Sequence, residues 1–196
     1  YKGRTVKIIQ GYGVGGTYGK SSTSLGNHLK DEIGAASVIA QSMPGAGGLK
    51  MTNYAYNVAP KDGSVLVMPP DTLVITELLR AGKAKYKSDG FTFLGGAVRS
   101  NSLSSVRADS GIKSWKDLRT KEIPFASSGL GSQTYQLPAL FNGLLKTKIK
   151  IVKGYRGSRK MLLAMARRTS FIVLLKNSHW AVHPLKKLQL PCLLSA

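Results

Sequence analysis

The stretch Gly11-Tyr12-Gly13-Val14-Gly15-Gly16 determines how the start of this chain folds. The apolar run of residues 5–9 leads into it, and the spacing of leucines predicts a helix over 17–33 after it. A glycine-rich loop between a strand and a helix lets backbone N–H groups approach an anion, and the helix dipole favours negative charge there. The stretch therefore predicts an α/β unit with a loop suited to binding an anion.

Gly11, Gly13 and Gly16 also satisfy the dinucleotide fingerprint G-x-G-x-x-G. That function needs an acidic residue at the end of the second strand, where it would bind the ribose hydroxyls. The second predicted strand, 37–41, runs into Ser42, and Asp31-Glu32 comes before that strand begins. The fingerprint therefore lacks the acidic residue at the end of the second strand, and this absence disfavours dinucleotide binding.

Further along, strands and helices alternate, which is typical of a parallel α/β sheet. In the first 80 residues the pattern predicts strands over 37–41 and 64–68 and helices over 47–57 and 72–80. The second half predicts strands over 91–98, 103–107, 123–126 and 149–153, with helices over 132–145 and 158–165, and residues 171–175 have the composition of a strand. The helix over 132–145 is expected to bury Leu137, Leu140, Phe141, Leu144 and Leu145.

The charge of the chain is strongly positive and unevenly distributed. Of 196 residues, 29 are Lys or Arg and 9 are Asp or Glu, and no acidic residue follows Glu122. Such a balance leaves open a nucleic-acid or anionic-surface binding protein, although the aromatic residues do not interleave with basic ones as in an RNA-binding sheet. The single cysteine, Cys192, excludes a disulfide within the chain. The chain opens on Tyr1 without a leader pattern, so a secretion signal is expected to be absent from it.

Residues for catalysis are sparse. The three histidines, His28, His179 and His183, have no partners in a recognisable motif, and no G-x-S-x-G sequence is present. His, Cys and carboxylate residues do not cluster as a metal site requires. We therefore expect no enzyme activity, no catalytic residue, no metal and no cofactor. The remaining candidates for a binding site are the hydroxyl groups and glycine amides of four loops, each of which joins a predicted strand to a helix. Such groups suit a carboxylate.

Several of these segments together resemble the Bug-type extracytoplasmic solute receptors of tripartite tricarboxylate transporters. The resemblance rests on the Gly11–Gly16 loop, on Met43-Pro44-Gly45-Ala46-Gly47-Gly48, and on Ala59-Pro60-Lys61-Asp62-Gly63. Phe125-Ala126-Ser127-Ser128-Gly129 and Gly154-Tyr155-Arg156-Gly157-Ser158 continue it, so that it covers about residues 2–165. It implies a two-lobed, type II periplasmic-binding-protein clamshell of α/β class.

The resemblance also implies a function and a site. The function is capture of a small carboxylate in the periplasm and delivery to the membrane permease subunits of the transporter, by a protein expected to be monomeric. The ligand would be held between the lobes, largely by backbone donors and ordered water. The implied ligand-binding residues are Tyr12, Gly15, Gly16, Thr17, Tyr18, Ser127, Ser128, Gly131, Ser132, Gln133, Tyr155, Gly157 and Ser158.

The resemblance ends near Met165, and a basic, leucine-rich sequence follows. We expect residues 1–98 to form the N-terminal part of the first lobe, 99–165 part of the second lobe, and 166–196 an anomalous basic tail. One hypothesis is that the clamshell is incomplete at its C-terminal end because the chain is truncated or frameshifted after about residue 165. Two alternatives to a working receptor follow: a non-functional receptor fragment, or a basic protein that binds nucleic acid or an anionic surface, with nucleic acid the less favoured partner.

Overall fold

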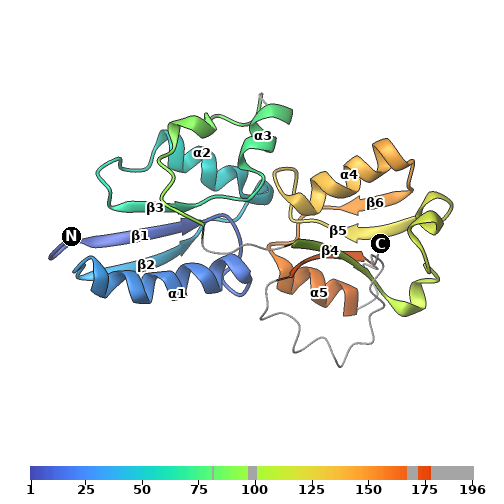
Figure 1. The fold of residues 1–196 in the computed structure, drawn as a ribbon, viewed down its shortest axis with the longest axis horizontal. Coiled ribbons are helices and arrows are strands. Elements are labelled where there is room, and N and C mark those ends of the chain that lie inside the picture. Colours follow the sequence, from blue (N-terminus) through green and yellow to red (C-terminus); the bar gives the residue numbers. More distant parts are fainter. Residues whose placement is uncertain (81, 97–100, 167–171, 178–196) are drawn as a thin grey trace. The chain divides into compact units, whose positions relative to one another are not determined.

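The computed structural model describes residues 1–80, 82–96, 101–166 and 172–177 of the chain. The chain divides into two compact units (Figure 1). Unit 1 consists of Tyr1–Leu94 and Ser128–Gln133, and unit 2 of Gly95–Ser127 and Thr134–Ala196. A short loop of the second half, 128–133, thus packs with the first half of the chain.

Unit 1 is built on a parallel sheet of three strands in the order β2-β1-β3. The sheet confirms the parallel arrangement predicted from the alternation of strands and helices. Its strands are β1 (Thr5–Gln10), β2 (Ser37–Ser42) and β3 (Val65–Met68). The helices are α1 (Thr17–Glu32), α2 (Leu49–Asn57) and α3 (Leu73–Leu79), with short 3-10 turns η1 (Ala46–Gly48) and η2 (Ser88–Gly90).

A helix covers each face of this sheet, as two neighbouring residues of β1 show. Neighbouring residues of a strand point to opposite faces. Ile8 and Ile9 of β1 are both fully buried. Ile8 lies under α1, where the missing side chain of Gly26 lets the helix approach within van der Waals distance of the strand. Ile9 packs with Met51 and Ala55 of α2. One apolar pair in the sequence thus holds a helix on each side of the sheet.

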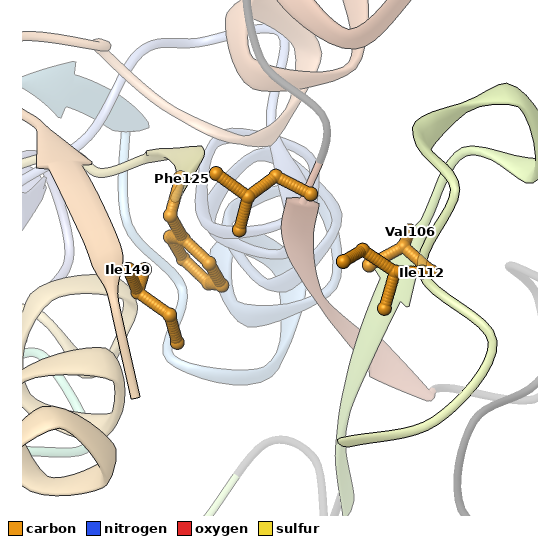
Figure 2. Close-up of a cluster of buried hydrophobic side chains, with 5 residues drawn as sticks. Val106, Ile112, Phe125 and Ile149 are labelled. Atoms are coloured by element: carbon orange, nitrogen blue, oxygen red, sulfur yellow. The ribbon is translucent and has the colours of Figure 1, made fainter. Parts of the chain in front are cut away.

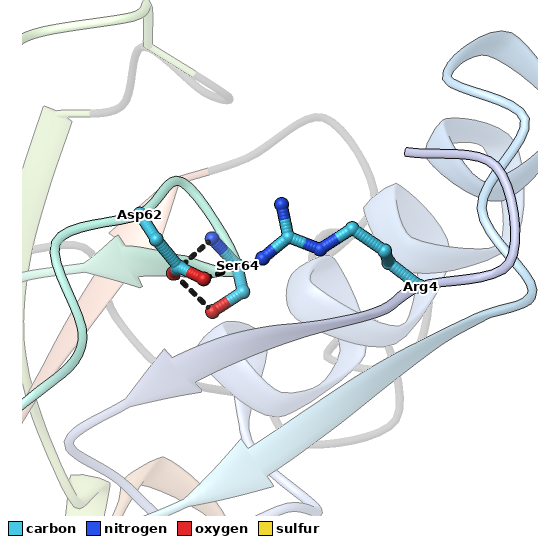
Figure 3. A network of polar contacts seen from close by, with 3 residues as sticks. All are labelled: Arg4, Asp62 and Ser64. Atoms are coloured by element: carbon cyan, nitrogen blue, oxygen red, sulfur yellow. Dashed lines mark hydrogen bonds and ion pairs between the residues drawn. The ribbon is translucent and has the colours of Figure 1, made fainter.

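A polar network fixes the beginning of the sheet in unit 1 (Figure 3). Asp62 Oδ1 accepts hydrogen bonds from the N–H of Ser64 at 3.0 Å and from its hydroxyl at 2.5 Å. The other carboxylate oxygen accepts from the guanidinium of Arg4, just before β1. These contacts lower the pKa of Asp62 to about 2, with the Ser64 hydrogen bonds contributing most. The turn entering β3 is therefore tied to the start of β1.

Unit 2 contains a mixed sheet of four strands in the order β4-β7-β5-β6. Strand β5 pairs in parallel with β6 and with β7, and β4 runs antiparallel to β7. The strands are β4 (Asn101–Val106), β5 (Ile123–Ala126), β6 (Ile149–Val152) and β7 (Ile172–Asn177). The helices are α4 (Gln133–Leu145) and α5 (Ser158–Ala166), with 3-10 turns η3 (Ala108–Ser110) and η4 (Trp115–Arg119).

The sheet of unit 2 also buries both faces. Phe125 of β5 belongs to a buried apolar cluster with Val106, Ile112, Ile123 and Ile149 (Figure 2). Leu137 and Phe141 of α4 pack against that cluster. The next residue of β5, Ala126, is fully buried and packs with Met161 and Met165 of α5. Again, two consecutive strand residues hold a helix on each face.

Three local predictions need correction or limitation. Residues 91–96 form no strand, and 97–98 lie outside the described residues. Phe93 is 85% exposed, so the alternating aromatic pattern there does not correspond to a half-buried strand face. Leu140, Leu144 and Leu145 are exposed rather than buried, because only the side of α4 with Leu137 and Phe141 faces the core. Of the segment 171–175, residue 171 also lies outside the described residues, and the remainder belongs to β7.

Candidate functional site

The Gly11–Gly16 loop joins the end of β1 to the start of α1 in unit 1. Gly16 precedes the helix in an extended conformation, with no side-chain cap, and its N–H donates to the carbonyl of Gly13 at 3.1 Å. Within the part of the chain that the structure describes, the N–H groups of Gly15 and Thr17 have no hydrogen-bond acceptor. The first turn of α1 contains no acidic residue. The loop therefore presents open amides at the positive end of a 16-residue helix.

Gly19 explains how tightly this loop is folded onto its own helix. A Cβ atom at Gly19 would lie 2.1 Å from the carbonyl oxygen of Val14 and 2.6 Å from its Cα. The backbone of the loop thus crosses directly over the first turn of α1. A glycine at this position is a requirement of the loop's path.

Tyr12 is held in place by its backbone and by its hydroxyl. Its N–H donates to Gln10 Oε1 at 2.7 Å, and its carbonyl accepts from the hydroxyl of Ser42 at the end of β2. The Tyr12 hydroxyl donates to the carbonyl of Gly47 at 3.1 Å. Because that proton is already engaged, Tyr12 offers an approaching ligand its ring and a hydroxyl lone pair. Ser42 and Gln10 were not among the predicted site residues.

Tyr18 lies against Tyr12, with ring centroids 4.5 Å apart and an angle of 32° between the ring planes. The Tyr18 hydroxyl accepts from the N–H of Asp71 at 3.2 Å. Burial raises the pKa of Tyr12 well above its usual range, and the nearby Tyr18 and Asp71 add to the shift. Tyr12 therefore stays neutral throughout the physiological pH range.

The 128–133 loop meets the second glycine loop of unit 1 backbone to backbone. Gly47 has φ +72°, and a Cβ atom there would lie 2.6 Å from the nitrogen of Ser132. The N–H of Gly131 donates to the carbonyl of Ala46 at 3.0 Å. The N–H and hydroxyl of Ser132 both donate to the carbonyl of Gly129, at 3.1 and 2.7 Å. Two of the predicted donors, Gly131 and Ser132, are thus already engaged.

Two threonines of unit 1 secure the same loop. The hydroxyls of Thr72 and Thr76 both donate to the carbonyl of Gly131, at 2.5 and 3.4 Å, and both side chains are buried. The sequence places Thr72 at the start of the predicted helix over 72–80 and gives that residue no further role. Thr72 precedes the short helix α3 and Thr76 lies within it, four residues later; this i, i+4 spacing is a signal for a shared partner but does not indicate which one.

In unit 2, the ends of β5 and β6 bring Ser127 and Tyr155 together. Ser127 is fully buried; its N–H donates to the carbonyl of Val152 at 2.8 Å, and its carbonyl accepts from the N–H of Tyr155 at 3.1 Å. The Ser127 hydroxyl lies 3.4 Å from that of Thr134. The Tyr155 ring packs against the cluster beneath α5 that contains Met161. These two loops form one backbone-linked ledge at the carboxyl ends of parallel strands.

Gly157 and Ser158 open α5 beside this ledge. Gly157 has φ +143°, and its carbonyl accepts from the N–H groups of Lys160 at 3.1 Å and Met161 at 3.3 Å. The first turn of α5 has no acidic residue. No hydrogen bond of the Ser158 hydroxyl occurs within the described ranges. Ser158 thus stands at a second helix N-terminus with its hydroxyl available.

The predicted site residues accordingly fall into two groups. Unit 1 gathers Tyr12, Gly15, Gly16, Thr17, Tyr18, Ser128, Gly131, Ser132 and Gln133, and unit 2 gathers Ser127, Tyr155, Gly157 and Ser158. Each group includes the residues at the start of a helix, α1 in unit 1 and α5 in unit 2. Among the residues that the structure describes, His, Cys, Asp and Glu form no group of three that could hold a metal ion. Every helix in the described ranges is too short or too polar to cross a membrane.

Comparison with known proteins places the fold. No protein-family model matches the sequence, and no curated protein does. Among solved structures, a periplasmic transporter superposes with a TM-score of 0.82 at 17% identity, covering 98% of this chain and 66% of its own. The periplasmic binding protein BugD gives a TM-score of 0.73 at 15% identity, covering 94% and 63%. This chain has the fold of the Bug-type periplasmic binding proteins.

A third solved structure carries a ligand. MatC from Rhodopseudomonas palustris, solved with bound malate, superposes with a TM-score of 0.80 at 20% identity, covering 97% of this chain and 66% of its own. The resemblance inferred from the sequence motifs and the expected type II α/β fold are both confirmed. The chain spans 63% to 66% of the length of these neighbours.

Proposed function

We propose that this chain is a periplasmic solute-binding receptor that captures a small carboxylate and delivers it to the permease of a tripartite tricarboxylate transporter. The observation that carries the proposal is the loop before α1. Gly15 and Thr17 offer open amides at the start of a long helix whose first turn contains no acidic residue. Such a site favours an anion with several lone pairs, as a carboxylate has.

The second group of loops supports the same ligand class. Ser158 and Gly157 stand at the start of α5, next to the ledge formed by Ser127 and Tyr155. The start of α5, like the start of α1, suits a carboxylate group of the ligand. The solved neighbour with malate supports a ligand of this kind.

The chemistry of the loops also argues for binding rather than catalysis. The groups available at Thr17 and Ser158 are neutral hydroxyls and amides, which hold an anion without exchanging protons with it near pH 7. The Tyr12 hydroxyl, with its raised pKa, remains protonated. A receptor that must release its cargo needs this kind of reversible, charge-complementary contact.

The direct test is calorimetric titration with malate and with other dicarboxylates of four to six carbons, together with melting curves. A ligand present at 100 times its Kd stabilises the folded state by about 2.7 kcal/mol, which raises Tm by several degrees. The neutral diester dimethyl malate is the matched control, and it should produce no shift. Equal stabilisation by the diester, or no stabilisation by any member of the panel, would contradict the proposal.

A further inference from the structure

Four basic side chains surround the loop that follows β6. Lys153, Arg156, Arg159 and Lys160, hereafter the 153–160 cluster, are all exposed. None of the four has an ion-pair partner among the described residues. The nearest acid before them in sequence is Glu122, and none follows. Within the described part of the chain, their charges are therefore not compensated by ion pairs.

The cluster stands where basic residues do not help the fold. Arg159 and Lys160 lie in the first turn of α5, which begins at Ser158. Cations at a helix N-terminus oppose the helix dipole, and each costs about 0.3–1 kcal/mol at low ionic strength. A helix selected only for stability would carry Asp or Glu in these positions. The unfavourable placement indicates that the charges act on something outside the helix.

The sheet register places this cluster at the end of unit 2 that carries the proposed ligand loop. Strands β5 and β6 are parallel, so their carboxyl ends share one edge. The loop 153–158 follows β6 there and is tied to Ser127 by the Tyr155 N–H. Basic residues near the opposite edge include Lys113, Lys116, Arg119 and Lys148; the N–H of Lys148 donates to the carbonyl of Leu118 in η4. Four strand residues separate the two edges by about 13 Å.

We propose that the 153–160 cluster steers dianionic ligands to this loop and so accelerates the capture of dicarboxylates relative to monocarboxylates. This inference rests on the proposed receptor function. A concentrated positive patch raises the association rate of an opposite charge by about 10- to 1,000-fold at low salt. The Coulomb energy between the patch and the ligand scales with the ligand charge. The factor by which the association rate of a dianion rises is therefore the square of the factor for a monoanion.

The test uses malate and 3-hydroxybutyrate, in which a methyl group replaces one malate carboxylate. Association and dissociation rates are measured by stopped-flow fluorescence for the wild-type chain and two variants. The cluster variant carries Lys153→Gln, Arg156→Gln, Arg159→Gln and Lys160→Gln. The matched control carries Lys113→Gln, Lys116→Gln, Arg119→Gln and Lys148→Gln, and thus has the same net charge. Melting curves and circular dichroism establish that both variants are folded.

At 10 mM salt, where the Debye length is about 30 Å, we expect the cluster variant to bind malate about tenfold more slowly. For 3-hydroxybutyrate, which carries one charge in place of two, the expected loss in association rate is about threefold. At 1 M salt, where the Debye length is about 3 Å, the difference should fall below about twofold. The dissociation rates should stay within about twofold of wild type, and the control variant should lose less than about twofold in association rate.

Several outcomes would overturn the inference. Equal slowing in both variants would show that only net charge matters, and a change confined to the dissociation rate would indicate a direct contact instead of steering. If the cluster variant instead loses salt-dependent affinity for duplex DNA with unchanged malate kinetics, the cluster is a nucleic-acid surface. If wild type binds no dicarboxylate at all, the receptor proposal itself fails, and the steering inference fails with it.

Discussion

Replacing Gly47 with alanine should loosen the 128–133 loop from unit 1. The new Cβ would lie 2.6 Å from the nitrogen of Ser132 and 3.0 Å from the carbonyl oxygen of Gly129. Since both neighbours are backbone atoms, the loop must shift as a whole. The shift would break the hydrogen bond from the Gly131 N–H to Ala46 and the hydrogen bond from the Thr72 hydroxyl to the Gly131 carbonyl.

The expected magnitude has two parts. An alanine at φ +72° costs about 1–2 kcal/mol from backbone strain alone. Two lost hydrogen bonds add about 0.5–1.5 kcal/mol each, for a total loss of about 2–5 kcal/mol in the free energy of unfolding. Gly34→Ala separates the two parts, because Gly34 has φ +61° and a Cβ added there would have no atom within 4 Å. That variant should lose only the strain energy.

Urea denaturation followed by circular dichroism measures the free energies, and amide hydrogen exchange reports the loop itself. The Gly47→Ala variant should lose protection at the amides of Gly131 and Ser132, whereas Gly34→Ala should keep it. If both variants are destabilised equally, and the Gly131 amide stays protected in both, the close approach of the two glycine loops does not contribute as described.

The other predictions concern stability. The pKa of Asp62 is about 2 in the folded protein, below the 3.8 that is usual for an aspartate. The stabilisation that ionised Asp62 gives the folded state is therefore fully present above pH 3.8 and is lost as the pH falls through 2. Asp62→Asn should therefore flatten the acid limb of a plot of stability against pH, while Asp89→Asn serves as a control; identical acid limbs in the two variants would contradict the assignment. Gly143→Ala, in the exposed last turns of α4 where no atom would contact the added methyl group, should raise stability by about 0.5–1 kcal/mol. A drop in urea midpoint for that variant would show that α4 is not helical at this position.

The fold was largely predictable because its pattern is local. Alternating apolar runs and glycine loops locate β1, α1, β2 and α2 to within a few residues, and each glycine loop coincides with the start of a helix. The failures arise where tertiary context decides. The pattern Phe-Thr-Phe-Leu at 91–94 has strand propensity but forms no strand. The exposed leucines of α4 follow the same spacing as the half-buried Leu137 and Phe141.

The site was predictable to a lesser degree. Glycine and hydroxyl loops are visible in the sequence, but their partners are not. Thr72 lies 59 residues from the Gly131 carbonyl that it contacts, and Ser42 lies 30 residues from the Tyr12 carbonyl. No periodicity links such pairs. Nor could the sequence show that the amides of Gly131 and Ser132 are already engaged, because these contacts depend on how the loops meet in space.

The proposed function depends above all on a ligand carboxylate that binds at the start of α1, and a charge placed at Thr17 probes that contact. Thr17 is exposed and is the first residue of the helix. Thr17→Asp should stabilise α1 by about 0.3–1 kcal/mol through the helix dipole, whereas Thr17→Asn is its neutral counterpart of the same shape. A ligand carboxylate about 5 Å from the introduced charge, at an effective dielectric constant near 20, is repelled by about 3 kcal/mol, or more than 100-fold in Kd.

Malate, or whichever dicarboxylate of the panel binds most tightly, is titrated calorimetrically into both variants. We expect Thr17→Asp to lose at least about 100-fold in affinity while its Tm is unchanged or higher, and Thr17→Asn to stay within about tenfold of wild type. Equal affinity of the aspartate and asparagine variants would refute the proposed contact, because no carboxylate could then lie at this loop.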